Sequence, residues 1–387
     1  MVSNKSWKIA SMPFVWSPLS SPKNGDDLPD NLPFELAFDE RTGLVIQRPN
    51  VEVQDALAVA YRKGSILTGL MDEEGIGRSY ADDFLSFIVR SIQRQEFSGL
   101  RILEIGCGNG YLLKRLRDAG AEVLGIEPGE HGQNGGDTWN VPIIHGCFPN
   151  KAVQDQFDLI ISFAVLEHVE NPQSFLSLIK SNLKPSGKVI IGVPDESPYI
   201  LHGDVSTLFH EHWSFFDAQT LSNTVRLAGY EELQIEQSGY GGSLYCAMRS
   251  VQGTTWLSAE VTANSVKRAR NYILEARSNC QKFSEYCEHI FAKNKTLGIY
   301  VPCRVVNVLA IANIPLKEIR FFDDNPAVHG TYFPGMNIPV ENRQQLIAAP
   351  TDYVLVMSRT FGDRLAQGLR EALPETIKIQ TVSEILG

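Results

Sequence analysis

Hydrophobic runs alternate with amphipathic stretches between residues 80 and 250, and this alternation predicts a parallel sheet with helices on both faces. The predicted strands are 100–105, 121–127, 157–164 and 187–194, and the predicted helices are 111–120, 172–183 and 217–230, the last with an N-cap at Asp217 and a glycine stop at Gly229. Residues 231–237 and 242–250 then alternate as an antiparallel pair. The fold class is therefore α/β, with a Rossmann-like sheet.

The rest of the chain predicts further parts around this sheet. Residues 1–60 form a short extension with a strand, a turn at Thr42 and Gly43, and a second strand. A hydrophobic stripe with steps of three and four predicts one long connecting helix in 255–294. Residues 295–387 predict a second, smaller α/β domain with four strands. The first domain then spans residues 61–254.

Composition excludes several classes of protein. Hydrophobic residues make up 43% of the chain and charged residues 21%, which is normal for a soluble globular protein. A net charge of −10 argues against a nucleic-acid surface, and no run approaches the ~20 apolar residues of a membrane span. The N-terminus lacks a secretory signal, and the six cysteines are scattered. We expect a cytoplasmic protein with reduced thiols.

The strongest chemical signal is EIGCGNG at Glu104–Gly110, where a strand meets a helix. Glycines at every second position allow a sharp turn and close backbone approach to a ligand. A dinucleotide site would need glycine or alanine at position 111, but Tyr111 stands there. The next strand ends in Glu127, 17 residues after the last glycine, where a carboxylate could take two ribose hydroxyls.

These features resemble the class I S-adenosylmethionine methyltransferases, whose pattern is a strand, E-x-G-x-G-x-G, a helix, a strand and an acidic residue. The segment FDLIISFAVLEHVENPQSFLSLIKSNLKPSGKVIIGVP is similar to the family's central region. The resemblance implies S-adenosyl-L-methionine as the cofactor. It also implies that the cofactor contacts Glu104, Gly106, Gly108, Gly110 and Glu127, in a cleft lined by Phe163, Ala164 and Leu166.

The segments that follow this region resemble one particular family of methyltransferases. HEHWSFF, SGYGGSL, a long helix and DDNPAVHGTYFPGMNIPV follow in the order seen in the sugar C-methyltransferases. The last segment satisfies that family's D-x-N-P-x-x-x-G-x-Y-x-P-G-x-x-I-P signature. The resemblance implies methylation of the carbon beside the keto group of a nucleotide-linked deoxysugar, with a second domain that binds substrate.

Residue roles follow from the same resemblance. The chemistry needs a base beside the α carbon and donors for the developing oxyanion. The resemblance makes His212 the base, with Glu211 supporting it and His168 close to the sugar. A further family tyrosine corresponds to Tyr61 or Tyr80. The substrate-binding set that we expect comprises Tyr80, His210, Gly242, Ser243, Arg304 and Asn325.

Three departures from the family pattern bear on these roles. The family's N-terminal four-cysteine zinc module is degenerate, with Asp39 and Thr42 where thiolates belong, so no zinc is expected there. Phe209 stands where the family commonly has tyrosine, which removes a hydroxyl from the mechanism. The C-terminal glycine-rich loop reads GIYVPCRV, with Arg304 in place of its lysine.

Other readings remain open at this stage. A metal bound by His202, His210 and His212 is conceivable if the segment is extended, but we expect none, because no clear further ligand is present. The chain could methylate oxygen or nitrogen on a sugar or another metabolite, or be an inactive cofactor-binding scaffold. The expected partner is a small molecule, with neither nucleic acid nor membrane.

Overall fold

The computed structural model describes residues 5–15, 17–23, 27–62, 71–253, 256–359 and 361–386, apart from the side chains of Arg62, Gln133 and Arg304. The chain forms two compact units. The central unit comprises residues 37–197 and 211–269, and the terminal unit comprises 1–36, 198–210 and 270–387. The boundaries expected at 60 and 294 therefore do not delimit the compact units, because each unit is assembled from separate stretches of chain.

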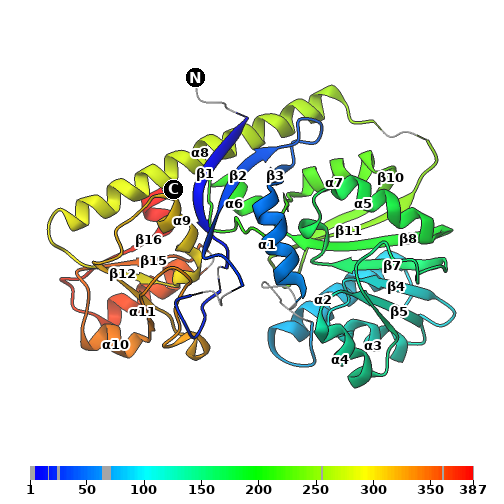
Figure 1. Cartoon of the computed structure of the whole chain (residues 1–387), viewed down its shortest axis with the longest axis horizontal. Helices are drawn as coiled ribbons and strands as arrows, with labels where there is room; N and C mark the ends of the chain where they lie inside the picture. The colour runs from blue at the N-terminus through cyan, green and yellow to red at the C-terminus, as the bar shows by residue number, and fades with distance from the viewer. Residues whose placement is uncertain are drawn as a thin grey trace. The chain divides into compact units, whose positions relative to one another are not determined.

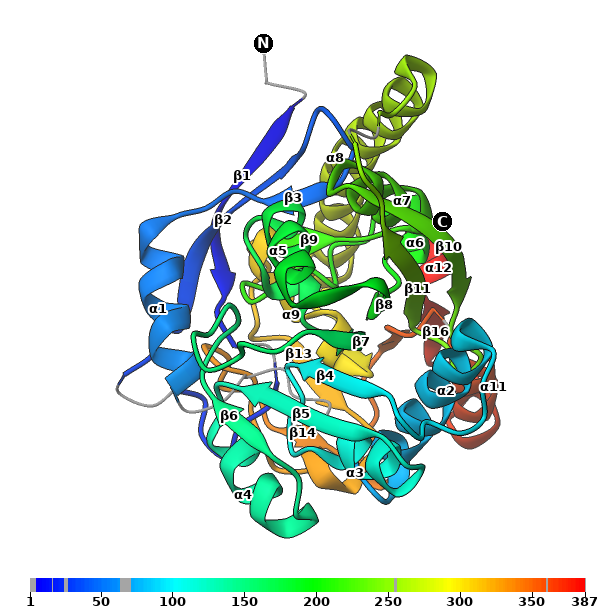
Figure 2. The same ribbon diagram turned by 90° about the vertical axis from the view of Figure 1, so that its right-hand side faces the viewer.

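The central unit is built on a seven-stranded sheet with the order β10-β11-β8-β7-β4-β5-β6 (Figure 2). Strands β4 to β8 are parallel, and β11 runs antiparallel to both β8 and β10. The strands are β4 Arg101–Ile105, β5 Glu122–Glu127, β6 Ile143–His145, β7 Phe157–Phe163, β8 Leu183–Pro194, β10 Tyr230–Gln237 and β11 Ser243–Ser250. The predicted strands and the antiparallel pair are thus confirmed.

Helices cover both faces of this sheet with apolar side chains. One hydrophobic cluster joins α2 and α3 to the sheet through residues such as Phe84 and Leu113, and another joins α5 and α7 through residues such as Leu176 and Leu221. The helices of this region are α1 Val51–Arg62, α2 Gly75–Ile92, α3 Tyr111–Asp118, α4 Glu130–Trp139, α5 Pro172–Ile179 and α7 Ala218–Leu227. Helix α6 Ser197–Leu201 lies, except for its first residue, in the terminal unit. The short strands β3 Val45–Gln47 and β9 Ser214–Phe215 pair antiparallel.

Local signals explain where these helices begin and end. The Asp217 side chain accepts from the Thr220 backbone N–H at 2.7 Å and completes a capping box at the start of α7, as predicted. Gly229 follows this helix with φ of 79°, which is the left-handed conformation of a glycine stop. The Asn171 side chain caps α5 by accepting from the Ser174 backbone N–H, with Pro172 in the first turn.

The terminal unit holds a five-stranded parallel sheet of order β14-β13-β12-β15-β16, and Figure 1 shows it packed with its own helices. Its elements are β12 Leu297–Tyr300, β13 Ile319–Phe322, β14 Val340–Glu341, β15 Tyr353–Val356, β16 Lys378–Thr381, α9 Val306–Ile311, α10 Arg343–Ala348, α11 Gly362–Ala372 and α12 Val382–Leu386. Strand β1 Ser6–Pro13 packs on α9, and β2 Asn31–Phe38 crosses the boundary between the units. The N-terminal residues therefore contribute to this core.

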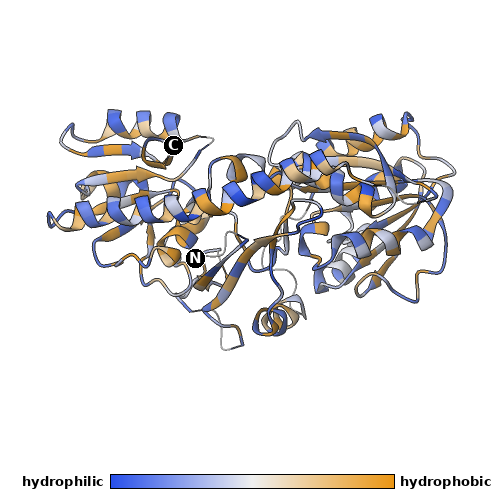
Figure 3. Ribbon diagram, turned by 90° about the horizontal axis from the view of Figure 1, so that it is seen from above, coloured by the Kyte–Doolittle hydropathy of each residue, from blue (hydrophilic) through white to orange (hydrophobic). Residues whose placement is uncertain are grey.

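The long helix α8 Ala259–Phe291 was expected from its hydrophobic stripe. Ile273, Phe283 and Ile290 on that stripe are fully buried. Figure 3 shows hydrophobic and hydrophilic residues alternating along this helix. In the described part of the chain, no helix is both long enough and apolar enough to cross a membrane.

Candidate functional site

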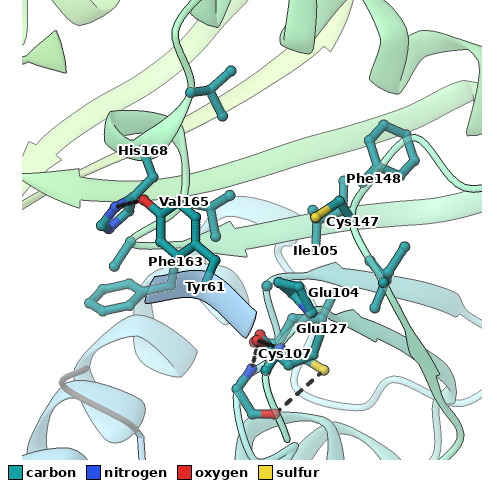
Figure 4. Close-up of a pocket in the computed structure, with 18 of the residues that line it drawn as sticks. Tyr61, Glu104, Ile105, Cys107, Glu127, Cys147, Phe148, Phe163, Val165 and His168 are labelled. Atoms are coloured by element: carbon teal, nitrogen blue, oxygen red, sulfur yellow. Dashed lines mark hydrogen bonds between the residues drawn. The ribbon is translucent and has the colours of Figure 1, made fainter. Parts of the chain in front are cut away.

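A cavity of about 570 Å³ opens in the central unit at the carboxyl ends of β4, β5 and β7. Ligands of open α/β sheets bind at such ends. Figure 4 shows two groups of side chains around this cleft: Glu104, Glu127 and Cys107 on one side, and Tyr61 and His168 on the other. The cavity therefore brings the predicted glycine-loop residues and one predicted substrate-side histidine into a single site.

The glycine loop adopts the conformation that its sequence predicts. Gly106, Gly108 and Gly110 have φ of 72°, 54° and 79°, in the left-handed region that glycine tolerates. A Cβ on Gly106 would also lie 2.3 Å from the Val165 side chain. The backbone N–H of Gly108 donates to a Glu127 carboxylate oxygen at 3.0 Å, so β5 holds the loop in place.

Two carboxyl groups face the cleft beside this loop. Glu104 is 3% exposed, and among the described residues its Oε2 has no hydrogen-bond partner. Burial, with a smaller contribution from the nearby Glu127, raises the pKa of Glu104 well above its ordinary value. Glu127 also accepts from the Gly129 N–H at 2.8 Å. This donor and acceptor set fits S-adenosylmethionine, since the unpaired carboxyl can accept from its ammonium group and Glu127 can accept from ribose hydroxyls.

Helix α4 adds a feature that the sequence analysis missed. It carries Gly132 and Gly135 in its interior, where glycine weakens a helix. A Cβ on Gly135 would lie 1.9 Å from the carbonyl oxygen of Asn109, and one on Gly132 would lie 2.6 Å from the Glu127 side chain. These glycines let α4 pack directly against the cofactor loop, and the three glycines within EHGQNGGDTW were the available signal.

His168 is held in the short helix η1 Leu166–His168 after β7. Its Nδ1 lies 3.0 Å from the backbone oxygen of Glu211 and 3.4 Å from the Tyr61 hydroxyl. A carbonyl only accepts, so Nδ1 carries the proton and donates to Glu211. The Tyr61 hydroxyl proton is then left to point elsewhere. Burial lowers the pKa of His168 to about 4, so the ring is neutral at pH 7.

His212 packs beside His168. Their ring centroids are 4.9 Å apart in an edge-to-face arrangement, and His212 is 7% exposed. Burial lowers its pKa well below 6.5, with a smaller effect from His168. Glu211 was expected to support His212, but the contact that its backbone makes is with His168, and its side chain is buried. The pair is therefore two neutral imidazoles, of which His168 lines the cleft, whereas His212 packs against His168 and is not among the residues that line the cavity.

Glu167 completes this cluster and was not singled out from the sequence. It is 1% exposed, and its Oε1 lies 3.9 Å from His168 Nε2. Burial raises its pKa to about 8. Its Oε2 has no hydrogen-bond partner among the residues that the structure describes. One ligand atom each from Glu167, His168 and His212 lies within 4.8 Å of the others.

The residues after β7 divide between cleft and core. Phe163 and Ala164 line the cleft, as expected, together with Val165. Leu166 was expected there too, but this prediction was wrong: it is 1% exposed and packs in the hydrophobic core. The cause is the start of the η1 turn at this position, which rotates the side chain inward.

His210 also departs from its expected place. It is fully buried, its Nε2 lies 3.3 Å from the Met12 carbonyl, and its ring packs against Phe14 and Phe34. It therefore belongs to the core of the terminal unit and does not line the cleft. Residues 210 and 211 form a turn, so His210 and His212 do not share the face that an extended segment would give them. This geometry does not support a metal site at His202, His210 and His212.

Both candidate tyrosines lie near the cleft but at different places. Tyr61 contacts His168, whereas Tyr80 packs on Phe163 with ring centroids 5.9 Å apart. Tyr80 also contacts the ring of Tyr240, in the turn that precedes Ser243. Its hydroxyl lies 3.7 Å from where a Cβ on Gly242 would be. This turn therefore packs through Tyr80 on Phe163, which lines the cleft, but Gly242 and Ser243 are not among the residues that line the cavity.

Asp83 on α2 anchors this turn, and the sequence analysis missed it. Its carboxylate accepts from the Ser238 hydroxyl at 2.5 Å, from the Tyr245 hydroxyl at 2.9 Å and from the Tyr240 backbone N–H at 3.3 Å. Two of the predicted substrate-binding residues, Asn325 and Arg304, belong to the terminal unit. Asn325 accepts from the Ala327 N–H within its own turn, and the Arg304 side chain lies outside the described residues.

Comparison with known proteins agrees with this site. A family model for a methyltransferase domain matches residues 77–235, and one for a C-methyltransferase C-terminal domain matches residues 240–380. The chain is 21% identical to the C-methyltransferase NovU of Streptomyces niveus over 291 residues, which cover 70% of this chain and 69% of the relative. It is 32% identical to the mitochondrial ubiquinone biosynthesis O-methyltransferase of Schizosaccharomyces pombe over 122 residues, which are 28% of this chain and 42% of that one. A tRNA U34 carboxymethyltransferase of Idiomarina loihiensis shares 29% identity over 160 residues, 36% of this chain and 48% of the relative.

Proposed function

Because the chain belongs to the S-adenosylmethionine-dependent methyltransferases, we propose that it methylates the carbon beside the keto group of a nucleotide-activated deoxysugar. The match of residues 240–380 to a C-methyltransferase domain supports carbon as the acceptor. The similarity to a C-methyltransferase over 70% of the chain supports the same choice. The observation that carries the proposal is that Tyr61 and His168 line the same cleft as the glycine loop, with His212 packed against His168.

The cofactor end of the cleft would position the methyl donor. S-adenosylmethionine, when bound, supplies an electrophilic methyl group on a sulfonium. Gly106 and Gly108 leave room for its close approach, and the unpaired Glu104 carboxyl would accept a hydrogen bond from its ammonium group. Glu127 would accept from the ribose hydroxyls while it holds Gly108 and Gly129.

At the other end, we assign proton removal to His212. The α-carbon proton moves to a ring nitrogen of His212, and the C–H electron pair forms the enolate. Bound S-adenosylmethionine would supply the methyl group to that carbon, and the protonated imidazole of His212 would return its proton to water. General base catalysis of this kind contributes about 10²- to 10⁴-fold.

Tyr61 would meet the oxyanion of the enolate. Its hydroxyl oxygen lies beside the Nδ1–H of His168, so its own proton is available to the substrate oxygen. This supplies the hydroxyl that Phe209 cannot give. His168 would thus orient Tyr61 and the sugar, with its own tautomer fixed by the Glu211 carbonyl.

The test is hydrogen exchange in deuterated water with a panel of 4-keto sugar nucleotides and no methyl donor. We expect exchange at the α carbon in the wild type, a loss of about 10²-fold or more in His212→Gln, and wild-type exchange in His145→Gln, which changes an exposed histidine of the same unit. Donor turnover on one of these substrates without any α-carbon exchange would instead indicate methylation of oxygen or nitrogen. No exchange and no turnover across the panel would contradict the proposal.

A further inference from the structure

We propose that Glu167, His168 and His212 form a binding site for a divalent transition-metal ion of the zinc type. Two imidazoles and one carboxylate are a ligand set that zinc uses in sites with an open fourth position. One ligand atom from each residue already lies within 4.8 Å of the other two. The proposal concerns the protein without substrate, and it holds or fails independently of the sugar reaction.

The separations are close to those that a tetrahedral ion requires. Zinc bonds to nitrogen and oxygen of about 2.0–2.2 Å place neighbouring ligand atoms roughly 3.3 Å apart. The Glu167 Oε1 and His168 Nε2 atoms are 3.9 Å apart. The whole set lies within 4.8 Å, so side-chain movements of up to about 1.5 Å would close it around an ion.

The protonation states also favour a cation. His168 donates from Nδ1 to the Glu211 carbonyl, which leaves the lone pair on Nε2, 3.9 Å from Glu167 Oε1. A backbone carbonyl on the second ring nitrogen is the usual support of a metal-bound histidine. Both rings are buried and neutral, as metal ligands must be.

Glu167 provides the independent observation that points to a ligand. Its side chain is 1% exposed, and Oε2 has no hydrogen-bond partner in the part of the chain that the structure describes. A buried carboxyl without a partner is costly, and a bound cation would remove that cost. His168 lines the cleft, so an ion has a path from solvent.

Metal binding has a consequence for the proposed chemistry. An ion held by His212 occupies the lone pair that would accept the substrate proton. Metal binding and proton abstraction by His212 would therefore exclude one another, so a bound ion would inhibit the proposed methylation. The carboxylate form of Glu167 would be needed, so binding would release its proton.

The test uses the full chain after chelation, titrated with Co²⁺ as a spectroscopic probe and then with Zn²⁺ in competition. We expect one equivalent of Co²⁺ with the intense visible bands of a tetrahedral ion, displaced by Zn²⁺. Glu167→Gln and His212→Gln should each weaken binding by at least about 100-fold, since both remove a direct ligand rather than a supporting group. His145→Gln should bind as the wild type does. Unchanged binding in Glu167→Gln, or a loss confined to His145→Gln, would overturn the proposal.

X-ray absorption on the wild-type Co²⁺ form decides the question even if a variant fails to fold. We expect imidazole and oxygen scattering without sulfur. Sulfur in the first shell would assign the ion to Cys107 or Cys147, which also line the cavity, and the proposal would be wrong. A protein that takes up no Co²⁺ at all would refute it equally.

Discussion

Replacing Gly135 by alanine tests whether α4 holds the cofactor loop. The new Cβ would lie 1.9 Å from the Asn109 carbonyl oxygen and 2.5 Å from its carbonyl carbon. Both atoms are backbone, so no side-chain rotation can relieve the contact. Because nonbonded carbon contacts favour about 3.5–4.0 Å, the loop or the helix must move by more than ~1 Å.

Two opposing effects set the change in the free energy of unfolding. Alanine in an exposed helix interior stabilises by up to about 1 kcal/mol relative to glycine. Overpacking of a tight contact costs about 1–3 kcal/mol, and the 1.9 Å separation puts this site at the upper end. We therefore expect a net loss of about 1–2 kcal/mol. The displaced Asn109 would carry Gly108 away from Glu127, so affinity for the cofactor should fall at least about tenfold.

The assays are urea unfolding and calorimetric binding of S-adenosylhomocysteine. Gly368→Ala in α11 is the stability control, because its Cβ would meet only the flexible end of Arg343 at 3.6 Å, and we expect a slight stabilisation. Gly136→Ala is the binding control within α4, with its nearest contact at 3.3 Å. If Gly135→Ala bound the product as tightly as Gly136→Ala and unfolded at the wild-type urea concentration, α4 would not position the loop.

Three further predictions follow from other contacts. Gly106→Ala, at φ of 72° with a valine methyl 2.3 Å from the new Cβ, should reduce cofactor affinity by at least about tenfold in the same calorimetry. Asp83→Asn should cost about 1–3 kcal/mol in urea unfolding, because it removes a charged acceptor from the Ser238 hydroxyl; an unchanged midpoint would show that the turn is held otherwise. Lys295 and neighbouring backbone lower the pKa of Asp352 to about 2, so the stability from this pair is present above pH ~4 and is lost as pH falls toward 2. When the free energy of unfolding is measured between pH 2 and 6, Asp352→Asn should lose less stability at acid pH than the wild type does. An unchanged dependence on pH would refute the assignment.

Much of the central sheet could be predicted because its signals are local. The runs at 100–105 and 157–164 are buried strands with the expected bounds to within one residue, and Asp217 caps its helix. Helix α2 and strand β1 were missed, since their burial depends on partners distant in sequence. The division into compact units was missed for the same reason, because no local pattern indicates that residues 1–36 pack with the C-terminal sheet.

In the candidate site, too, the residues with local sequence signals were predicted and the others were not. The glycine loop and Glu127 lie within one strand–helix–strand stretch, so spacing alone placed them correctly. Leu166 and His210 were misplaced because a single turn of the backbone decides which way each side chain points. Glu167 and Asp83 could not be found at all from one sequence, because their roles arise only from what the fold brings next to them.

The histidine pair depends on a backbone clamp rather than on the residues that flank it in sequence. The Trp213 N–H donates to the Glu167 carbonyl at 2.7 Å, and the Trp213 carbonyl accepts from the Gln47 N–H at 3.1 Å. This residue therefore ties the segment that carries His212 both to η1 and to β3. None of these bonds involves the glycine loop, so a shift of β3 would change the distance between His212 and His168 without loosening the cofactor. If His212 is the base, as proposed, proton removal and cofactor binding would be physically separable.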